Sequence, residues 1–535
     1  MQYDRNTLPH ERDSGRTDGA PAGSTRRFLS VRRVLVGLLG VLLTVGGLLG
    51  VNWWTSRYPA AINMSSICAP EAMQPMGMGS TGTMCPPGSL SATPATGISI
   101  ASLQAPLAAA HTDTFTLTAQ PARLDLGAGV RADAWTFNGT TPGPTLRVHQ
   151  GDLVIVKLNN HLSVGVTIHW HGVAVPNSAD GVAGLTQDAV KPGETYIYRF
   201  IAKDPGTYWY HSHQESFAET SRGLYGLLIV EPTTPVTHDD VDVGIVLHSW
   251  GAIAVNDTVG TLHIPAQPGQ WIRLRLLNTD NYPYHLTVVG APFLVAALDG
   301  HDLNEPTPLT ATTISIDAAQ RYDLRIRMPK RGPVALLVAK DGEQQYRPAP
   351  AVLVGMGALE PSLIPTAIGT AFDMTAYGQR QSQVITAQSH FDATYTVTVG
   401  YSVGFSNGRP GPVFTLNGAV FPQTPTIMVQ PGQVVKLHLV SDAANGIHPM
   451  HLHGHTFTVL AKNGRPLTGS PIYLDTISMR PHESYDVAFV ADNPGLWMFH
   501  CHNLYHANHG MDMMVVYPNI TTPYTIGSAS GNFPD

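Results

Sequence analysis

Leu496-Trp497-Met498-Phe499-His500-Cys501-His502, followed by His506 and Met511, places five metal-ligand side chains in one short stretch of the chain. The apolar residues before His500 and the run Met513-Met514-Val515-Val516 predict β-strands, along which side chains alternate between two faces. His500 and His502 therefore point to one face and Cys501 to the other. If both faces bind metal, Cys501 belongs to a thiolate site and its two neighbours, His500 and His502, belong to a histidine site. Electrons can then pass between the two sites through adjacent residues.

The residues after His502 fit a metal site on the cysteine side. A cysteine thiolate, two imidazoles and a distant thioether are the ligands of a blue-copper electron-transfer centre, whose weak axial ligand helps to set the reduction potential. Cys501 and His506 supply two of these ligands, and Met511 is placed to be the axial one. The second imidazole has to come from elsewhere in the chain.

Three more histidine clusters lie upstream. Two of them, His169-Trp170-His171 and His211-Ser212-His213, are His-x-His pairs near predicted strands, so each pair projects both imidazoles to one side. The third, His448-Pro449-Met450-His451-Leu452-His453, holds another such pair, and its first histidine stands before a proline that breaks regular structure. A single pair in a chain with 24 histidines is commonly accidental. Four clusters, one with a central cysteine, predict a metal assembly.

The four motifs HWHG, HSH, HPMHLHGH and HCHNLYHANHGM resemble those of the multicopper oxidases, the laccase-like family, over most of the chain after about residue 113. The resemblance implies a four-copper enzyme. It implies a type 1 copper on His448, Cys501 and His506 with Met511 axial, a type 2 copper on His169 and His451, and two type 3 coppers, one on His171, His211 and His502 and one on His213, His453 and His500. In such an enzyme Cys501 and its flanking histidines pass electrons to the three-copper cluster, where dioxygen is reduced to water.

Protons must accompany the electrons, so we expect a carboxylate near the cluster. Asp180, in Pro176-Asn177-Ser178-Ala179-Asp180-Gly181, stands where similar oxidases place such an acid, and an Asp-Gly turn is the alternative. Many bacterial relatives carry a glutamate just before the type 1 histidine, where this chain has Tyr505. The second proton donor is therefore open. Glu215 is one substitute, but an exposed glutamate at the end of a strand is the favoured interpretation.

An internal repeat organises the chain. Asn138-Gly139, an alternating strand and His169-x-His171 recur as Asn417-Gly418, an alternating strand and His451-x-His453, and a middle copy keeps only His285. We therefore predict an all-β chain of three β-sandwich domains, at residues 113–233, 234–365 and 366–535. The family resemblance implies that each is a cupredoxin-like Greek-key domain. Because the first and third domains carry the histidine pairs, they must meet at the cluster. The middle domain, with no copper ligands, is predicted to be a spacer.

The N-terminal region predicts a membrane segment. An arginine-rich tail (1–33) precedes an apolar run (34–52) that ends beside Trp53-Trp54 and is just long enough to cross a bilayer. Arginine on the N-terminal side keeps the tail in the cytoplasm and places the rest outside. We predict an extracytoplasmic protein anchored to the cell membrane, and the alternative is a cleaved signal of the twin-arginine type.

Residues 53–112 are predicted to be a linker rich in Met, Pro and Gly. Cys68 and Cys85 bracket four methionines there: Met73, Met76, Met78 and Met84. A disulfide between the two cysteines is preferred over a thiol copper site in an oxidising compartment. Thioethers are soft ligands that select Cu(I), and copper-tolerance members of the family often carry such stretches. A disordered tether is the alternative.

The sequence also limits the partners. Dioxygen and a reductant are expected, with Cu(I) the leading reductant and phenols or aromatic amines close behind, because a methionine axial ligand disfavours the most demanding phenols. The alternative is a noncatalytic protein of the cell envelope that binds and sequesters copper. A net charge of -7, with no long basic patch outside the N-terminal tail, gives no case for nucleic-acid binding.

Overall fold

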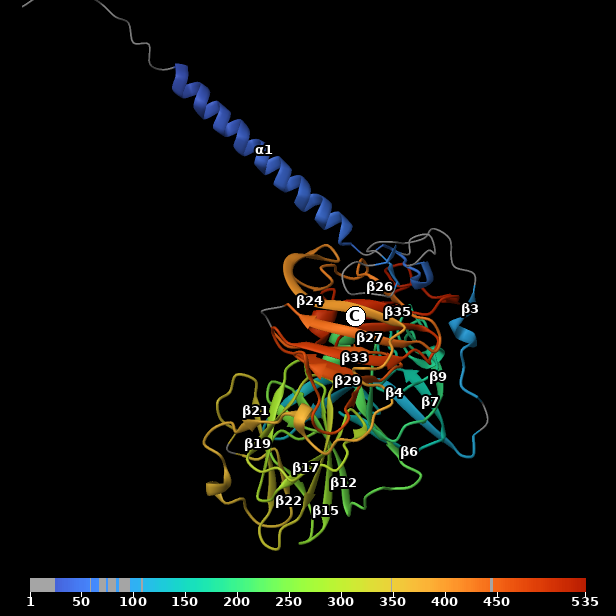
Figure 1. Ribbon diagram of the computed structural model, residues 1–535, viewed down its shortest axis with the longest axis vertical. Helices are drawn as coiled ribbons and strands as arrows, with labels where there is room; N and C mark the ends of the chain where they lie inside the picture. The colour runs from blue at the N-terminus through green and yellow to red at the C-terminus, as the bar shows by residue number, and fades with distance from the viewer. Residues whose placement is uncertain are drawn as a thin grey trace, which may run out of the picture. The chain divides into compact units, whose positions relative to one another are not determined.

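The computed structural model describes residues 25–57, 59–66, 74–75, 83–85, 97–106, 109–347, 349–442 and 446–535. The chain divides into one unit up to residue 57 and a second unit from residue 58. In the second unit the strands form pairs of sheets (Figure 1), which make three β-sandwiches along the chain. The all-β prediction is confirmed.

The first sandwich consists of two four-stranded sheets, in the orders β5-β4-β7-β9 and β6-β11-β10-β8. Alternating apolar residues such as Leu117, Val156 and Leu158 are fully buried between them, as the period of a half-buried strand requires. Its elements are β4 (Thr112–Asp125), β5 (Arg131–Phe137), β6 (Gly143–His149), β7 (Leu153–Asn160), β8 (His169–His171), η4 (Asn177–Ala179), β9 (Thr195–Ile201), β10 (Gly206–His211), α2 (Ser216–Ser221) and β11 (Tyr225–Glu231).

The middle sandwich consists of two six-stranded sheets, in the orders β13-β12-β15-β20-β17-β18 and β14-β22-β21-β16-β19-β23. Its elements are β12 (Val241–Ser249), β13 (Ile253–Val255), β14 (Leu262–Ile264), β15 (Trp271–Asn278), β16 (Tyr284–Val289), β17 (Phe293–Leu298), β18 (His301–Asp302), β19 (Thr312–Ile316), β20 (Arg321–Arg327), β21 (Val334–Lys340), β22 (Val352–Val354) and β23 (Thr370–Ala371), with η5 (Pro361–Leu363) and η6 (Met374–Ala376). His285 lies on β16, where its Nε2 is 3.3 Å from Oδ1 of Asp341.

The third sandwich has a sheet in the order β25-β24-β27-β33-β29-β30, with β31 beside β29, and a sheet in the order β1-β2-β26-β35-β34-β28-β32. Its elements are β24 (Ala393–Ser406), β25 (Arg409–Leu416), β26 (Thr426–Met428), β27 (Val434–Ser441), β28 (His448–Leu452), β29 (Phe457–Lys462), β30 (Arg465–Pro466), β31 (Tyr473–Leu474), β32 (Thr476–Met479), β33 (Ser484–Val490), β34 (Leu496–Cys501), α3 (Leu504–Ala507) and β35 (Asp512–Val516).

The predicted linker contributes to this body. β1 (Gln74–Pro75) and β2 (Thr83–Cys85) extend a sheet of the third sandwich, and β3 (Ile98–Ser99) pairs with β36 (Ile520–Thr521). Short 3-10 turns lie at η1 (Met64–Ser66) and η3 (Ile100–Ser102). The domain boundaries given above stay predictions.

The internal repeat has a structural cause in its Asn-Gly turns. Asn138 and Asn417 both adopt the left-handed conformation, at φ 59° and 51°. The side-chain oxygen of each accepts a backbone N–H from the neighbouring strand at 2.6 Å. Asn256 in the middle sandwich also has a positive φ, 54°, and its side-chain oxygen accepts a backbone N–H at 2.8 Å. The middle copy of the repeat therefore keeps the same turn, which was not recognised in the sequence. Asparagine suits these positions because it tolerates positive φ and bonds its own backbone surroundings.

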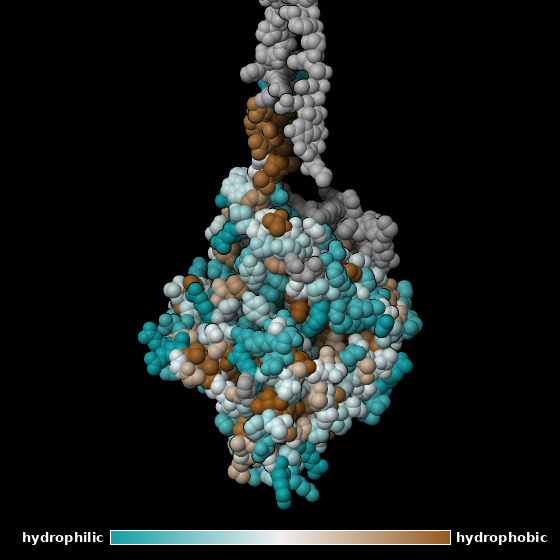
Figure 2. All heavy atoms as spheres, turned by 90° about the vertical axis from the view of Figure 1, so that its left-hand side faces the viewer, coloured by the Kyte–Doolittle hydropathy of each residue, from teal (hydrophilic) through white to brown (hydrophobic). Residues whose placement is uncertain are grey.

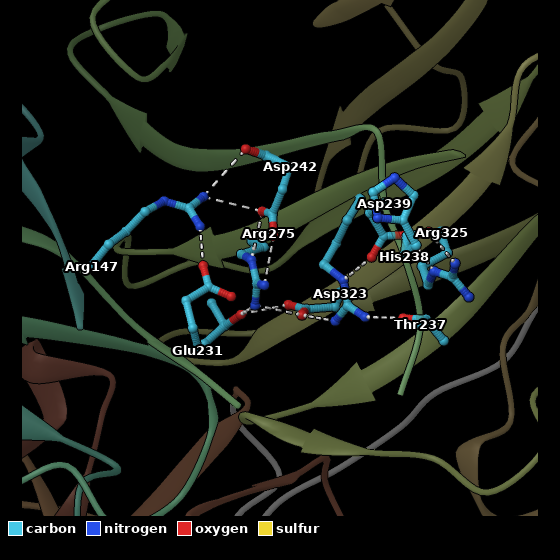
Figure 3. A network of polar contacts seen from close by, with 11 residues as sticks. Arg147, Glu231, Thr237, His238, Asp239, Asp242, Arg275, Asp323 and Arg325 are labelled. Carbon is cyan, nitrogen blue, oxygen red and sulfur yellow. Dashed lines mark hydrogen bonds and ion pairs between the residues drawn. The ribbon is translucent and has the colours of Figure 1, made fainter. Parts of the chain in front are cut away.

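Charged residues join the first and middle sandwiches (Figure 3). Arg147 on β6 pairs with Glu231 and reaches Asp242 on β12 at 3.2 Å. Arg275 on β15 binds the same Asp242 carboxylate through two nitrogens, each at 2.7 Å, and Asp323 on β20 at 3.1 Å. Arg147 therefore links the two sandwiches through Asp242, and the bidentate pair with Arg275, the stronger class of charged contact, fixes that carboxylate within the middle sandwich.

The first unit contains α1 (Thr25–Thr55), whose stretch from Arg32 to Trp54 has a mean hydropathy of 2.5 and no buried residues within the structure. Figure 2 shows a stretch of this helix in brown, the colour of apolar residues. A helix of this length and composition fits an export signal or a membrane anchor.

Candidate metal centres

The cysteine site lies within the third sandwich. Sγ of Cys501, at the end of β34, is 3.9 Å from Nδ1 of His448 and 3.6 Å from Nδ1 of His506. The three side chains are buried, and His506 keeps only 8% exposure. Met511 is fully buried beside them, since its carbonyl oxygen accepts from the backbone N–H of Cys501 at 3.1 Å. The four residues that the sequence assigned to one copper therefore lie together.

Burial controls the protonation of this site. It raises the pKa of the Cys501 thiol well above its ordinary value, and it lowers the pKa of His506 to about 2, with the neighbouring His448 acting in the same direction. The imidazole is therefore neutral and available as a ligand. A cation is needed to stabilise the thiolate here, which is the form that binds metal.

Eight histidines meet where the first and third sandwiches adjoin. Strand register brings them together, because His211 on β10 pairs with His169 on β8, and His500 on β34 pairs with His451 on β28. Rings from the two sandwiches then stack, with centroids 3.9 Å apart for His169 and His453. All eight are buried: His169, His171, His211, His213, His451, His453, His500 and His502.

Seven of the eight rings are oriented by groups outside the cluster. In seven of the eight rings, one nitrogen contacts a protein oxygen at 2.9–3.2 Å. Since a carbonyl or carboxylate only accepts, that nitrogen carries the proton and the other presents a lone pair. Four of the inward nitrogens have no polar partner in the described part of the chain: Nε2 of His169, His213 and His451, and Nδ1 of His171.

The positions of the inward nitrogens indicate what the histidine cluster can bind. Nε2 of His453 and Nε2 of His500 lie 3.0 Å apart, although Nδ1 of each ring already contacts an oxygen. Two lone pairs at this separation repel unless a cation lies with them. Burial and the neighbouring imidazoles hold the pKa values of His211, His213, His453 and His500 well below the ordinary value, so these rings are neutral ligands. The donor set therefore fits metal ions that prefer imidazole, copper among them.

Asp180 lies in the cluster and connects the two sandwiches. Its Oδ2 accepts from Nδ1 of His453 at 3.0 Å, and its carbonyl oxygen accepts from Nδ1 of His169 at 2.9 Å. The side chain is fully buried. The turn interpretation holds as well, because Gly181 has φ 78° and a Cβ there would lie 1.8 Å from the carbonyl oxygen of Ile168.

A second carboxylate, Asp475, holds the opposite side of the cluster and was missed in the sequence. Its Oδ1 accepts from Nε2 of His171 at 3.0 Å, and its carbonyl oxygen accepts from Nδ1 of His451 at 2.9 Å. Arg321, on β20 of the middle sandwich, binds both Asp475 oxygens at 2.9 and 2.5 Å and lies 3.4 Å from Asp299. The lone charge in the stretch Tyr473–Met479 is the signal that could have identified Asp475, whereas Arg321 lies in a strand with three other charged residues and gives no such signal.

The pKa values of the carboxyl groups around Arg321 reflect both burial and the guanidinium charge. Burial by itself raises the pKa of Asp475, but Arg321 and His171 outweigh it and hold that pKa well below the ordinary value. Burial raises the pKa of Asp299 to about 7, against the effect of Arg321. The middle sandwich therefore supplies the countercharge for a cluster carboxylate. The prediction that it is only a spacer is wrong in this respect, although none of its described residues is among the predicted copper ligands.

The remaining sequence candidates lie away from the cluster. Glu215 is exposed, as the favoured interpretation held. Tyr505 is 36% exposed and packs beside His506. Cys85 is buried and disulfide-bonded, which favours the disulfide over a thiol copper site, and its predicted partner Cys68 lies outside the described residues. Of the four methionines between the two cysteines only Met84 is described, and it is buried. The others are Met73, Met76 and Met78.

A buried thiolate-histidine site joined through one strand to an eight-histidine cluster defines a copper oxidase. Comparison with known proteins leads to the same class. Multicopper oxidase family models match residues 118–235 and 382–520. Multicopper oxidase MmcO of Mycobacterium tuberculosis is 29% identical over 76% of this chain and 87% of its own length. Laccase-1 of Botryotinia fuckeliana is 28% identical over 75% of this chain and 81% of its own. The crystal structure of a multicopper oxidase from Pseudomonas thermotolerans matches with a TM-score of 0.60 and 29% identity, over 76% and 99% of the two chains.

The chain belongs to the multicopper oxidase family, laccase-like in type. It is an oxidoreductase that oxidises a reductant with dioxygen as the electron acceptor, and it binds type 1, type 2 and type 3 coppers. The prediction of family, fold and enzyme class is confirmed, and the noncatalytic alternative is not favoured. Bound copper would supply one-electron transfer at both centres. The surrounding residues hold the imidazole rings in position.

Proposed function

We propose that this oxidase takes its electrons from phenols or aromatic amines at the surface beside His506. The proposal includes the ligand assignment from the sequence, with the type 1 copper on His448, Cys501 and His506 and the three-copper cluster on the other eight histidines. The distances and burial of these side chains support the assignment, because the ligand atoms lie within 4.8 Å of one another, in buried positions, both for His448, Cys501 and His506 and for His213, His453 and His500.

An aromatic surface over His506 carries the substrate proposal. The ring of Phe414 stacks on that of His506, with centroids 3.9 Å apart and planes at 24°. Tyr401 and Tyr505 flank Phe414 at 5.5 and 6.1 Å and are 40% and 36% exposed. His509 packs on Tyr505 at 4.1 Å. We call these four residues outside the ligand set, Tyr401, Phe414, Tyr505 and His509, the aromatic face.

The aromatic face suits a flat organic donor. Exposed rings bind another ring by offset or edge-to-face contact, and such a contact places the donor within a short distance of a predicted type 1 ligand. A methionine axial ligand implies a modest reduction potential, so electron-rich phenols and amines are the expected members of the class. Cu(I) has less support than the sequence suggested, because Met84 is buried in a strand beside β26 and cannot serve as a surface thioether.

Oxygen uptake by the copper-loaded protein tests the proposal, with an electron-rich phenol, an aromatic amine, Cu(I) and Fe(II) compared at matched concentrations. We expect the organic donors to be faster. Replacing Tyr401 and Tyr505 by Leu should raise KM for the phenol about 2- to 10-fold, since an aromatic pair contributes roughly 0.5–1.5 kcal/mol. Tyr282→Leu, at a 68% exposed tyrosine of the middle sandwich, is the matched control. Faster turnover of Cu(I), or an unchanged KM in the double variant, would contradict the proposal.

We also propose that α1 is retained as an anchor that holds the oxidase on the outer side of the cell membrane. Its length and mean hydropathy support a span, Trp53 and Trp54 suit the interface, and Arg32 and Arg33 suit the cytoplasmic end. The test is fractionation of cells followed by sequencing of the mature N-terminus. An intact N-terminus in a membrane fraction that resists high-salt extraction supports an anchor, and a soluble protein that begins after residue 55 supports a cleaved signal.

A further inference from the structure

The segment Asn532–Asp535 is anchored beside the histidine cluster. Asn532 is buried, with its Oδ1 accepting from the backbone N–H of Ala189 at 2.9 Å. Its Nδ2 donates to Asp188 Oδ1 at 2.8 Å and to the carbonyl oxygen of Thr525 at 2.9 Å. These contacts satisfy most of the amide group inside the protein, so the segment has a defined position.

The following residues contact the chain immediately after β10. The backbone N–H of Phe533 donates to Gln214 Oε1 at 2.9 Å, and its carbonyl oxygen accepts from the N–H of Glu215 at 2.6 Å. The carbonyl oxygen of Pro534 accepts from Nδ1 of His213 at 3.0 Å. That contact fixes which nitrogen of His213 carries the proton and directs the other inward. The segment is therefore part of the surroundings of the cluster.

Asp535 brings a carboxyl group to a site already lined by acids. Its Oδ1 accepts from the hydroxyl of Ser216 at 2.5 Å, and its side chain interacts with Asp512 of β35. Glu219, one turn further along α2 from Ser216, is 2% exposed and interacts with Ser212. Asp535 Oδ2, Asp512 Oδ1 and Glu219 Oε2 are shielded from solvent and have no hydrogen-bond partner among the described residues.

The setting of these groups favours their protonated forms. Burial raises the pKa of Asp535 to about 6, against the effect of the hydrogen bond from Ser216. Burial also raises the pKa of Glu219 well above its ordinary value. A carboxyl group that holds its proton at mildly acidic pH and lies beside a reaction site can act as an acid. No carboxyl group stands next to His506 in sequence, where this chain has Tyr505.

We propose that Asp535 is a proton-transfer residue for dioxygen reduction, placed behind the cluster by the segment Asn532–Asp535. Reduction of one dioxygen to two waters takes four electrons from the reductant and four protons from solvent. In this scheme Asp535 releases a proton toward the cluster and regains one from the solvent side, so its carboxyl group is unchanged over a cycle. The titratable groups that act on its carboxyl group are Asp512, in contact with it, and the more distant His169 of the cluster, and the same segment also holds His213.

The test uses Asp535→Asn in the full copper-loaded protein, because this change keeps the shape of the side chain and its hydrogen bond to Ser216. We expect copper content and blue absorbance to stay unchanged while oxygen turnover falls roughly 10- to 100-fold, with a larger solvent deuterium isotope effect. Asp535→Glu should recover most of the loss. A second readout needs no turnover: the copper-free protein should show an infrared carboxyl band that titrates near pH 6 and disappears in Asp535→Asn.

Two further variants separate proton transfer from a structural role. Glu215→Gln removes an exposed carboxylate in the same stretch and should behave like the parent protein. Asn532→Ala loosens the segment and should lower copper content. Turnover of Asp535→Asn within about twofold of the parent from pH 5 to 8 would overturn the proposal. Loss of copper in Asp535→Asn, as in Asn532→Ala, would also overturn it, because the side chain would then act only in holding the segment.

Discussion

The cysteine site and the histidine cluster differ in how much of the molecule each requires. All four predicted ligands of the cysteine site come from the third sandwich, and Cys501 and His506 are five residues apart. The cluster takes its rings from the first and third sandwiches, a countercharge from Arg321 of the middle one, and a carbonyl oxygen from the segment at residue 534. A site within one sandwich depends on local folding. A site shared between sandwiches depends on every contact that holds them in register.

The largest expected effect is that of Cys501→Ser, which removes the local site and leaves the shared one. The variant should lose its blue absorbance and all measurable oxidation of organic donors, because the thiolate is the ligand that links the donor to the cluster. We expect it to bind one copper fewer per chain, with the cluster retained. Metal analysis and the magnetic resonance signal of the type 2 copper check this. Loss of every copper would show that the two sites are not independent.

Arg321→Met tests the shared site from the middle sandwich. The change leaves the fully buried Asp475 carboxylate without its cation, and breaking a buried ion pair in this way costs about 3–5 kcal/mol. The free energy of unfolding of the copper-free protein, measured in urea, should fall by that amount. In the copper-loaded variant the cluster should lose metal before the blue absorbance is affected.

Two comparisons sharpen the Arg321 prediction. Arg123→Met removes one partner of an ion pair that is about 80% exposed on both sides, and it should leave the unfolding midpoint unchanged. Adding Asp475→Asn to Arg321→Met should recover part of the lost stability, because the uncompensated charge is then removed. Equal effects of the Arg123 and Arg321 variants would contradict a role for the middle sandwich in the cluster.

Asp180→Asn changes proton supply without removing a ligand. The amide still fits between His169 and His453, but it cannot deliver a proton, so turnover in oxygen should slow by roughly 100-fold while the blue absorbance persists. The measurement is oxygen uptake together with anaerobic reduction of the blue centre by a phenol. Normal reduction of the centre with slow oxygen uptake is the expected pair of results. Unchanged oxygen uptake would remove Asp180 from proton transfer.

Much of the fold could be predicted because strand alternation and turn chemistry are local. Asn138-Gly139 and Asn417-Gly418 identified two copies of the repeat, and both turns are present with the expected positive φ. The third copy was only partly visible. Its turn uses Asn256 followed by Asp257, so the glycine that marks the other two is missing, although the hydrogen bond to the neighbouring strand is the same.

The ligand side chains could be predicted, but the groups that orient them could not. His-x-His spacing states where imidazoles point, because strand geometry fixes it. Nothing in the spacing relates His171 to Asp475, which is 304 residues away, or His213 to Pro534. Those contacts depend on how whole sandwiches pack. A carbonyl acceptor such as Pro534 leaves no side-chain signature at all, whereas a lone charge between two uncharged strands, as at Asp475, does.

The smallest effect concerns pH and the network of Figure 3, which joins the first and middle sandwiches. Burial acts to raise the pKa of Asp242, but its contacts with Arg275 and Arg147 outweigh this and lower that pKa below its ordinary value of 3.8. A carboxyl group whose pKa is lower in the folded state stabilises the fold above its unfolded pKa, and the stabilisation is lost as pH falls through the folded value. The urea midpoint should therefore decline below about pH 4, and less steeply in Asp242→Asn, which should be less stable than the parent at pH 7. If the network supports the shared site in particular, acid should release cluster copper before it bleaches the blue centre, and simultaneous loss of both would contradict that order.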